Sequence, residues 1–412
     1  MKTFNIYLLG LVLTLLACKS QKKTDVPKPI ANLTYDTVWT IPASYSLKPH
    51  LTKEGNVVYN DLFSPNPKGG SIFIVDGLTG KQLFEWNNYL HTPLTISDNG
   101  VFYKDNKMVF CNGPRNYCIN TENGATLWRT QMLDYSASTF LFSDSNKYYY
   151  QGMSNANYQV DIYKSEIESG KKEIAFSIFD TTKMYEDLLV NPIVVSINSK
   201  NESVLLTKVA FRAAINDYPL KTKVFCYNLT QKKLDWVEDF EGKMNQIHVS
   251  NFATKGNKTF LSGFYQKTWY IFCLDNDNGQ IIWQQVLPNF CVGLHLYEDQ
   301  VIAMSAGQSP ITSFNTTNGN PKWTTSFFDE PYYDINFDFG DAIVFKNYLI
   351  STQGDYLLGL NLENGRVICH KKMALPNSYM QYGIAINEEK RLFYVQDRFR
   401  LLCYRLPKEI AY

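Results

Sequence analysis

A hairpin pattern that recurs along most of the chain constrains the fold more than any other feature of the sequence. Each copy has a strand that ends in an apolar residue followed by Asp or Asn, a turn that closes on Gly, and a second strand that usually carries Trp. Successive turns are spaced by about 47 residues, a repeat length typical of propeller blades. Five copies are clear, two are weaker and one is truncated: 75–86, 119–128, 274–283, 314–323 and 360–369; 166–176 and 227–236; 404–409.

The residues around each hairpin indicate a four-stranded unit. Asp or Asn folds onto the local backbone, Gly supplies the positive φ that closes the turn, and two further apolar strands precede the hairpin, as at 101–104 and 107–110. No helical periodicity of useful length follows the first thirty residues. We therefore predict an all-β fold, an eight-bladed β-propeller of four-stranded antiparallel blades. The chain stops just after the last turn, so the N-terminal strand at Tyr35–Ile41 is expected to close the ring.

The first seventeen residues have the pattern of an export signal. A positive start precedes an apolar run of about 13 residues, which is too short for a membrane-spanning helix of about 20. The following Leu15-Leu16-Ala17-Cys18 resembles the bacterial lipobox, which implies cleavage before Cys18 and lipidation of its thiol. The alternative is an ordinary secretory signal in which Cys18 is incidental. We predict a signal peptide at 1–17, a lipidated Cys18 with a flexible tether at 18–33, and a propeller at 34–412.

The tether also bears on the destination of the protein. In enterobacterial sorting, an Asp directly after the lipidated Cys retains a lipoprotein at the inner membrane, and this position is Lys19 here. An outer-membrane lipoprotein whose body faces the periplasm is therefore expected. Surface display is the alternative, although the acidic cluster that directs it in several Bacteroidetes-type systems is represented only by Asp25.

Charge and histidine content exclude two classes of function. The chain has 40 basic and 39 acidic residues with no basic block after the tether, so a surface that follows a nucleic-acid backbone is not expected. Its five histidines are far apart and there is no CxxC or HExxH motif, so no zinc site is predicted from spacing.

Seven cysteines follow Cys18, an odd number that argues against a complete disulfide framework. Cys111 and Cys118 flank a predicted hairpin tip and could pair across it. Cys118 and three others share one position in their repeats, six residues before the position that closes the turn, which is typical of small packed core residues: Cys226, Cys273 and Cys403.

The hairpin from Val75 to Trp86 resembles the repeat of the pyrroloquinoline-quinone (PQQ) propeller superfamily, and the likeness extends over residues 35–412. That superfamily includes eight-bladed quinoprotein dehydrogenases and non-enzymatic propellers such as the BamB lipoproteins of outer-membrane assembly. A dehydrogenase would use PQQ with calcium, an adjacent-cysteine pair and a catalytic Asp, and this sequence has no Cys-Cys pair. The run Asp275–Gly279 is similar to a calcium loop but lies where every other unit has its turn.

No residue of the sequence is assigned a catalytic, cofactor-binding or metal-binding role. Two stretches are more aromatic or charged than simple turns and are candidate contacts with a protein partner, since exposed aromatic residues and Arg dominate binding energy. The alternative is a connecting segment whose aromatic side chains fill the core. We expect a monomeric, lipid-anchored scaffold without a cofactor; the alternatives are a PQQ-dependent oxidoreductase and a surface-exposed binder of glycans or proteins. The candidate contact residues are Phe327, Phe328, Tyr332, Tyr333 and Arg212.

Overall fold

The computed structural model describes residues 37–410, apart from fifteen internal segments, and all statements below refer to the described part. Cys18, the tether, Phe328, Tyr332 and Tyr333 lie outside it. The segments not described are 44–47, 62–69, 89–100, 113–114, 132–141, 145–146, 155–158, 180–186, 213–220, 241–251, 266–267, 328–341, 354–355, 373–380 and 398–399.

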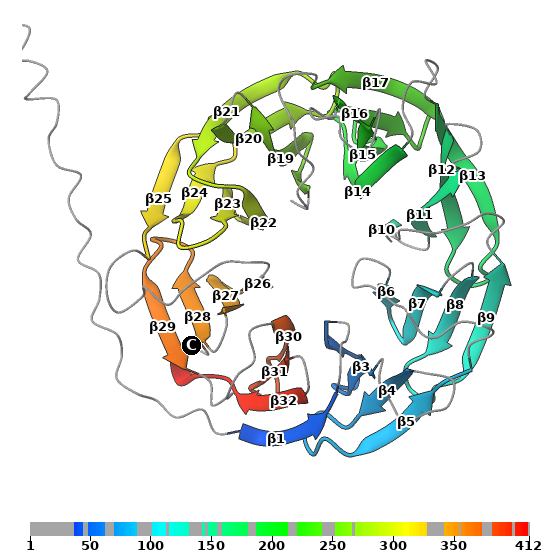
Figure 1. Ribbon diagram of the computed structural model, residues 1–412, viewed down its shortest axis with the longest axis vertical. Coiled ribbons are helices and arrows are strands. Elements are labelled where there is room, and N and C mark those ends of the chain that lie inside the picture. The colour runs from blue at the N-terminus through cyan, green and yellow to red at the C-terminus, as the bar shows by residue number, and fades with distance from the viewer. Residues whose placement is uncertain are drawn as a thin grey trace, which may run out of the picture.

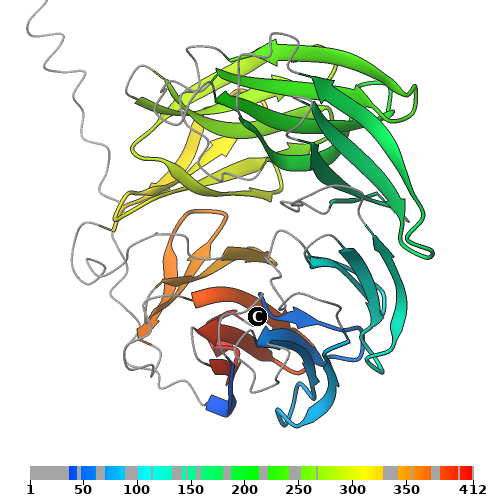
Figure 2. The same cartoon turned by 45° about the vertical axis from the view of Figure 1, so that its right-hand side comes forward.

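The described residues form eight four-stranded antiparallel sheets, arranged around a ring as the blades of a propeller (Figure 1). The fold class expected from the repeat is thus confirmed. In each of blades 1 to 7 the strands follow chain order from the inside of the ring to its rim. Figure 2 shows that the blades are twisted sheets, with the green blades of the middle of the chain opposite the blue and red blades of its two ends.

The strands of blades 1 to 4 are β2 (His50–Leu51), β3 (Val57–Asp61), β4 (Ser71–Val75) and β5 (Gln82–Trp86); β6 (Val101–Lys104), β7 (Lys107–Asn112), β8 (Arg115–Asn120) and β9 (Thr126–Gln131); β10 (Phe142–Asp144), β11 (Lys147–Ser154), β12 (Gln159–Glu166) and β13 (Lys172–Phe179); β14 (Asp187–Ile197), β15 (Ser203–Arg212), β16 (Lys221–Asn228) and β17 (Lys233–Asp239). Those of blades 5 to 8 are β18 (Ala253–Lys255), β19 (Lys258–Tyr265), β20 (Thr268–Asp275) and β21 (Ile281–Leu287); β22 (Cys291–Tyr297), β23 (Gln300–Ser305), β24 (Ile311–Asn315) and β25 (Pro321–Thr325); β26 (Ala342–Phe345), β27 (Tyr348–Gln353), β28 (Tyr356–Asn361) and β29 (Val367–Lys372); β30 (Gln381–Asn387), β31 (Leu392–Asp397), β32 (Arg400–Arg405) and β1 (Thr37–Pro42).

Blade 8 combines the two ends of the chain. Its sheet order is β1-β32-β31-β30, so the first described strand takes the rim position beside three C-terminal strands (Figure 1). Trp39 of β1 pairs with Cys403 of β32, as Trp128 pairs with Cys118 inside blade 2. β1 therefore occupies the place that the fourth strand holds in every other blade. A short 3-10 helix, η3 (Lys408–Ile410), follows β32.

Tryptophan residues on the rim strands join neighbouring blades. At five boundaries the indole Nε1 donates a hydrogen bond to a turn carbonyl of the next blade, at 2.7 to 3.3 Å. The same indole covers the Gly that closes this turn, so a Cβ on that Gly would lie 2.5 to 2.8 Å from the ring. These glycines also have positive φ, so two independent constraints exclude a side chain. The five pairs are Trp39 with Gly80, Trp128 with Gly170, Trp236 with Gly279, Trp283 with Gly319, and Trp323 with Gly365.

The contact between a rim aromatic and a turn glycine corrects the assignment of Trp86 as the aromatic residue of the repeat in blade 1. Phe84, not Trp86, lies against the next turn glycine, Gly124, with its Cβ 3.3 Å from where a Cβ of Gly124 would be. Trp86 is two residues further along and packs edge-on against Phe110, with 5.2 Å between ring centroids. Phe84 lies four residues after Gly80, the same spacing as from Gly124 to Trp128, so the conserved spacing and not the residue type marks the position that meets the next turn.

Blade 3 departs from the common pattern at its rim strand. The register shift falls at Ile162/Tyr163, closer to the middle of the strand than in the other blades, so Glu173 pairs with Lys164 and forms an ion pair at 3.2 Å. Phe176 stacks on Tyr227 of blade 4. The strand β13 contains no Trp, and the next turn closes on Lys232 at a φ of 56°.

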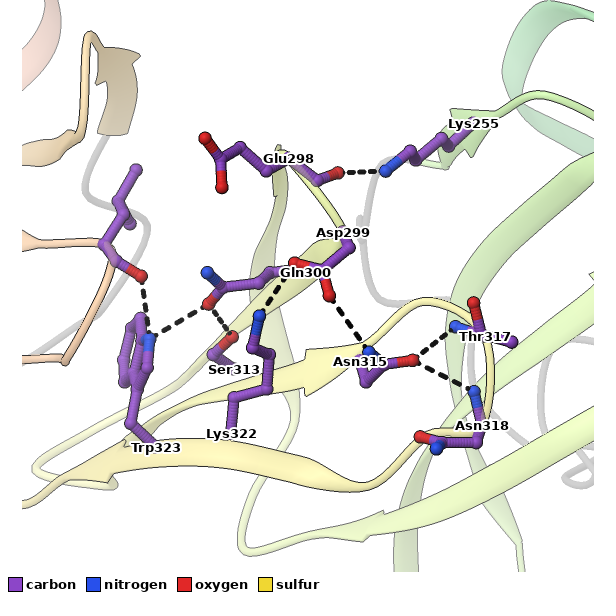
Figure 3. Close-up of polar contacts among 11 residues, drawn as sticks. Lys255, Glu298, Asp299, Gln300, Ser313, Asn315, Thr317, Asn318, Lys322 and Trp323 are labelled. Carbon is purple, nitrogen blue, oxygen red and sulfur yellow. Dashed lines mark hydrogen bonds and ion pairs between the residues drawn. The ribbon is translucent and has the colours of Figure 1, made fainter.

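Figure 3 shows how the polar turn residues of blade 6 are connected. Asn315 accepts hydrogen bonds from the Thr317 and Asn318 amides, which is the turn chemistry expected from the repeat. Trp323 Nε1 donates both to Gln300 Oε1 at 3.0 Å and to the Leu362 carbonyl of blade 7 at 2.9 Å. Hydrogen bonds on the turn face thus connect blade 6 both internally and to blade 7.

The cysteines described by the structure are free and buried. The open question of a Cys111–Cys118 disulfide is answered by the strand register, because Cys111 pairs with Asn116 and Cys118 with Val109. The predicted core role of Cys118, Cys226, Cys273 and Cys403 is confirmed, since each is 0 % exposed. Three of them pair with the rim Trp of their own blade and Cys403 pairs with Trp39, where a small residue leaves room for the indole.

Candidate binding site in the central channel

The inner strands of blades 7, 8, 1 and 2 enclose a cavity of about 470 Å³ at the centre of the ring. These strands are β26, β30, β2 and β6, which face the middle of the ring in Figure 1. Most of the wall is aliphatic. The lining residues are Lys48, Pro49, His50, Leu51, Val101, Tyr103, Ile343, Val344, Phe345, Ile384, Ala385 and Ile386.

The apolar wall comes from runs of consecutive residues. Ile343, Val344 and Phe345 all line the cavity from β26, and the run 384–386 does so from β30. In a strand with one wet face, apolar and polar residues would alternate, because successive side chains point to opposite faces. Val344 retains 36 % of its surface exposed, so part of this apolar wall is open.

A small polar group interrupts the apolar wall. The His50 ring stacks on the Tyr103 ring, with centroids 3.5 Å apart and planes 7° from parallel. Burial, and secondarily the positive charge of Lys48, lower the pKa of His50 to about 4. His50 is therefore neutral near pH 7, and Lys48 is the only charged side chain among the described residues of the lining.

Gly383 makes room for Lys48. Its φ is 125°, and a Cβ at this position would lie 2.5 Å from Lys48 Cγ and 3.0 Å from Lys48 Cα. A side chain at position 383 would therefore collide with the stem of Lys48, so the glycine allows β30 to approach the segment that carries this charge.

Comparison with known proteins identifies the fold. A family model described as outer membrane protein assembly factor BamB matches residues 220–404. Among solved structures, BamB from Moraxella catarrhalis is 12 % identical and superposes with a TM-score of 0.56 over 91 % of this chain and 99 % of that one. No curated protein matches the sequence.

The chain is a β-propeller, and its residues 220–404 match a model of PQQ-type repeats.

Other solved structures of this shape have different printed descriptions. A europium-containing methanol dehydrogenase is 9 % identical, with a TM-score of 0.59 over 89 % of this chain and 86 % of that one. Sqt1 of Saccharomyces cerevisiae is 10 % identical, with a TM-score of 0.60 over 92 % of this chain and all of that one. At these identities the β-propeller fold alone is shared, and function has to be argued from the site.

The described lining of the central cavity offers no side-chain ligand of the type that a calcium ion beside PQQ would use. Calcium prefers carboxylate and carbonyl oxygens, and no carboxylate side chain is among the described residues that line the cavity. Across the described residues, no group of three His, Cys, Asp or Glu side chains is placed to hold a metal ion. The calcium-loop likeness of Asp275–Gly279 is explained by turn geometry, because Asp275 Oδ1 accepts a hydrogen bond from the Asp277 amide at 2.8 Å.

A second cavity, of about 420 Å³, lies on the turn face between blades 4 and 5. Its most perturbed group is Glu202, which accepts hydrogen bonds from the amide groups of Gln231, Asn198 and Asn228. These bonds lower the pKa of Glu202 to about 2. The carboxylate connects the two hairpin ends of blade 4, where Lys232 closes the turn in place of glycine, so we assign it a structural role.

Of the five residues that were expected to contact a partner, Phe327 is the one whose side chain the structure describes. Phe327 is 0 % exposed and packs with Leu349 and Leu358 in the core between blades, so it cannot contribute to an exposed surface as proposed from sequence. It has the alternative role of filling the core. Arg212 ends β15, and its side chain lies outside the described residues, as do Phe328, Tyr332 and Tyr333.

The described part of the chain contains no helix long and apolar enough to cross a membrane.

The residues of the central cavity were missed from sequence, although a signal was present. The apolar strands 342–345 and 101–104 were recognised, but only as blade strands. Apolar and polar residues do not alternate along these strands, and this indicates that both faces of an inner strand are covered or line a cavity.

Proposed function

We propose that this protein is a non-enzymatic, lipid-anchored scaffold of outer-membrane protein assembly whose propeller faces the periplasm and binds a protein partner. The observation that carries the proposal is the match of the BamB family model to residues 220–404, which span the end of blade 4 and blades 5 to 8. The absence of a metal-binding cluster among the described residues agrees with a binding role. A rigid ring with exposed turns is sufficient for such a role.

The scaffold role is tested by complementation. A strain that lacks the protein is expected to contain fewer folded outer-membrane proteins, measured by heat-modifiable mobility on gels. The wild-type protein should restore the folded fraction, and Cys18→Ser should not, because the body is then no longer concentrated at the membrane. Unchanged folded fractions in the deletion strain would contradict an assembly role.

The anchor itself is tested by fractionation. Each buried acyl methylene contributes about 0.8 kcal/mol, so the lipid on Cys18 should hold the wild-type protein in the membrane fraction while Cys18→Ser is soluble. Lys19→Asp serves as the matched variant: in an enterobacterial host it should keep the anchor but move the protein to the inner membrane. Retention of Cys18→Ser in the membrane would rule out the lipid as the anchor.

The second candidate function is a PQQ-dependent oxidoreductase, which the similarity to a methanol dehydrogenase keeps open. Calorimetric titration of the soluble Cys18→Ser protein with PQQ and calcium, followed by a dye-linked alcohol oxidation assay, separates the two. Binding with turnover would replace the scaffold proposal, and the lining of the cavity leads us to expect neither.

A further inference from the structure

We infer that the outer edge of blade 5 is a docking site for an extended strand of another polypeptide, one with aliphatic residues at alternate positions. The edge is the strand β21, Ile281–Leu287, which lies at the rim of its sheet in Figure 1. The inference rests on the protein having a polypeptide partner, as the scaffold proposal states, and names the surface that binds and the conformation of what is bound. The peptide experiment below can fail while the complementation experiment succeeds.

The main chain of β21 has one side open. Among the described residues it pairs with β20 alone, and no main-chain hydrogen bond leads from Ile281–Leu287 to another blade. In an antiparallel strand that is paired on one side, every second residue directs its N–H and C=O groups away from the sheet. Only water or a further strand can satisfy these groups, so the edge is a template for strand addition.

β21 lacks the residues that protect an exposed strand edge from pairing, which are charged residues, Lys above all, and Pro. Six of the eight described rim strands carry at least one charged residue, namely Glu85, Arg129, Lys172, Lys233, Lys322 and Lys371. The rim strand β1 is uncharged but ends on Pro42, which has no amide hydrogen to offer a new strand. β21, with the sequence IIWQQVL, contains neither a charge nor a proline.

Alternate residues of β21 hold the strand in place and leave its other face open. Trp283 and Leu287 are buried and pack in the core between blades 5 and 6. Gln284 and Val286 point to the opposite face, because side chains alternate along a strand, and both are exposed. Val286 retains 59 % of its surface exposed, more than any other large hydrophobic side chain among the described residues. The edge is therefore fixed in position but not covered.

The bulge of β21 limits the docking site to the second half of the strand. Ile281 and Trp283 pair with adjacent residues of β20, so Ile282 is the extra residue of the bulge. From Trp283 to Leu287 every residue pairs with β20 in regular register. A further strand can extend the sheet along this regular stretch.

The exposed side chains define the strand that fits. A new strand would lie about 4.8 Å from β21 and would place alternate side chains beside Gln284 and Val286. An aliphatic side chain opposite Val286 would remove apolar surface of both residues from water, whereas a charged one would lose hydration without gaining a partner, since β21 has no charge. The side chains of the other face have no such requirement and can be polar. Strand addition of this kind takes its affinity from the main chain and its specificity from alternate side chains.

The test is binding of a fluorescent, end-capped peptide of alternating Val and Thr to the soluble Cys18→Ser protein, measured by anisotropy at pH 7.5. Saturable binding at one site is expected, with slower hydrogen exchange at the outward amides of Trp283–Leu287. Two control peptides should bind at least about tenfold more weakly. The first has N-methyl groups on two successive central amides, which block both of its edges, and the second has Lys in place of Val. Equal binding of the methylated peptide would overturn strand pairing.

Three variants locate the site. Val286→Lys gives the edge a protecting charge and should weaken binding of the Val/Thr peptide at least about tenfold, whereas Val286→Thr, which stays uncharged and β-branched, should bind within about twofold of wild type. Leu127→Lys, at an exposed apolar residue of the rim strand β9, should bind as wild type. Thermal unfolding of all three variants checks that they are folded. Equal losses in Val286→Lys and Leu127→Lys would contradict the assignment, and wild-type self-association that Val286→Lys removes would assign the edge to a second copy of the chain instead.

Discussion

At the scale of single residues, the turn glycines illustrate how a position can be constrained from two sides. Gly365 has a φ of 71°, a conformation that costs other residues about 1–2 kcal/mol, and its Cα faces the Trp323 ring. Gly256 has a similar φ of 57° but no heavy atom within 4 Å of where a Cβ would stand. Substitutions at Gly365 and Gly256 can therefore separate the cost of backbone strain from the cost of the collision with the indole.

We expect Gly365→Val to destabilise the protein more than Gly256→Val. Both variants force a β-branched residue into positive φ, but only the first also has to displace the indole, which should add about 1–3 kcal/mol. Chemical denaturation of both variants measures the difference. Equal losses would show that the indole does not restrict the turn.

His50 makes stability depend on pH. Burial, with a contribution from Lys48, lowers its pKa from 6.5 to about 4, so between these values the unfolded chain binds a proton that the folded protein does not. Stability from this residue is present above about pH 6.5 and is lost as pH falls toward 4, by up to about 3 kcal/mol. His50→Gln should remove this part of the pH dependence. Denaturation of both proteins from pH 4 to 8 provides the test, and parallel curves would contradict it.

At the scale of the elements, the bulge in each rim strand decides which residue reaches the next blade. In blade 1 the strand β5 presents Phe84 to Gly124, and in blade 2 the strand β9 presents Trp128 to Gly170. In blade 3 the bulge is displaced and the rim strand has no Trp, and the next turn closes on Lys232 at positive φ instead of on a glycine. The glycine requirement of a turn is thus set by the rim strand of the preceding blade.

Phe84→Trp should complete the one indole contact that blade 1 lacks. The next turn already closes on Gly124, so the new Nε1 can donate to the Thr121 carbonyl, the equivalent of the Ile167 carbonyl that accepts from Trp128. We expect a gain of about 1 kcal/mol, the usual net value of a hydrogen bond. Trp128→Phe is the reciprocal variant and should lose a similar amount. A lower midpoint of unfolding for Phe84→Trp would mean that blade 1 is spaced differently from blade 2.

At the scale of the whole molecule, one blade is assembled from both ends of the chain. β1 covers the edge of β32, and Trp39 reaches across to Gly80 and the Gly77 carbonyl of blade 1. β1 therefore connects β30, β31 and β32 to blade 1, although it lies far from these three strands in the sequence. Removing this segment would expose an unpaired strand edge, which favours association with other chains.

Deletion of residues 1–43 should lower the melting temperature and cause concentration-dependent self-association, whereas deletion of residues 1–33, which removes only the predicted signal and tether, should do neither. Differential scanning calorimetry and sedimentation velocity measure the two effects. If both truncated proteins melt at the same temperature and stay monomeric, β1 does not stabilise the ring.

The sequence by itself determined the number of blades, the strand order within them and the chemistry of the turns, because a hairpin is specified by residues a few positions apart. It also indicated that Cys118, Cys226, Cys273 and Cys403 are core residues, since each recurs at one place in the repeat. The spacing of four residues from the turn glycine to the rim aromatic could also have favoured Phe84 over Trp86. Only the tertiary structure decided that Cys111 does not face Cys118 and that Phe327 is buried. Each of these depends on a bulge, a register or a neighbouring blade, which local residue patterns do not specify. The central cavity depends on the tertiary structure most of all, because Lys48, Tyr103, Val344 and Ile384 come together only when the ring brings blades 1, 2, 7 and 8 side by side.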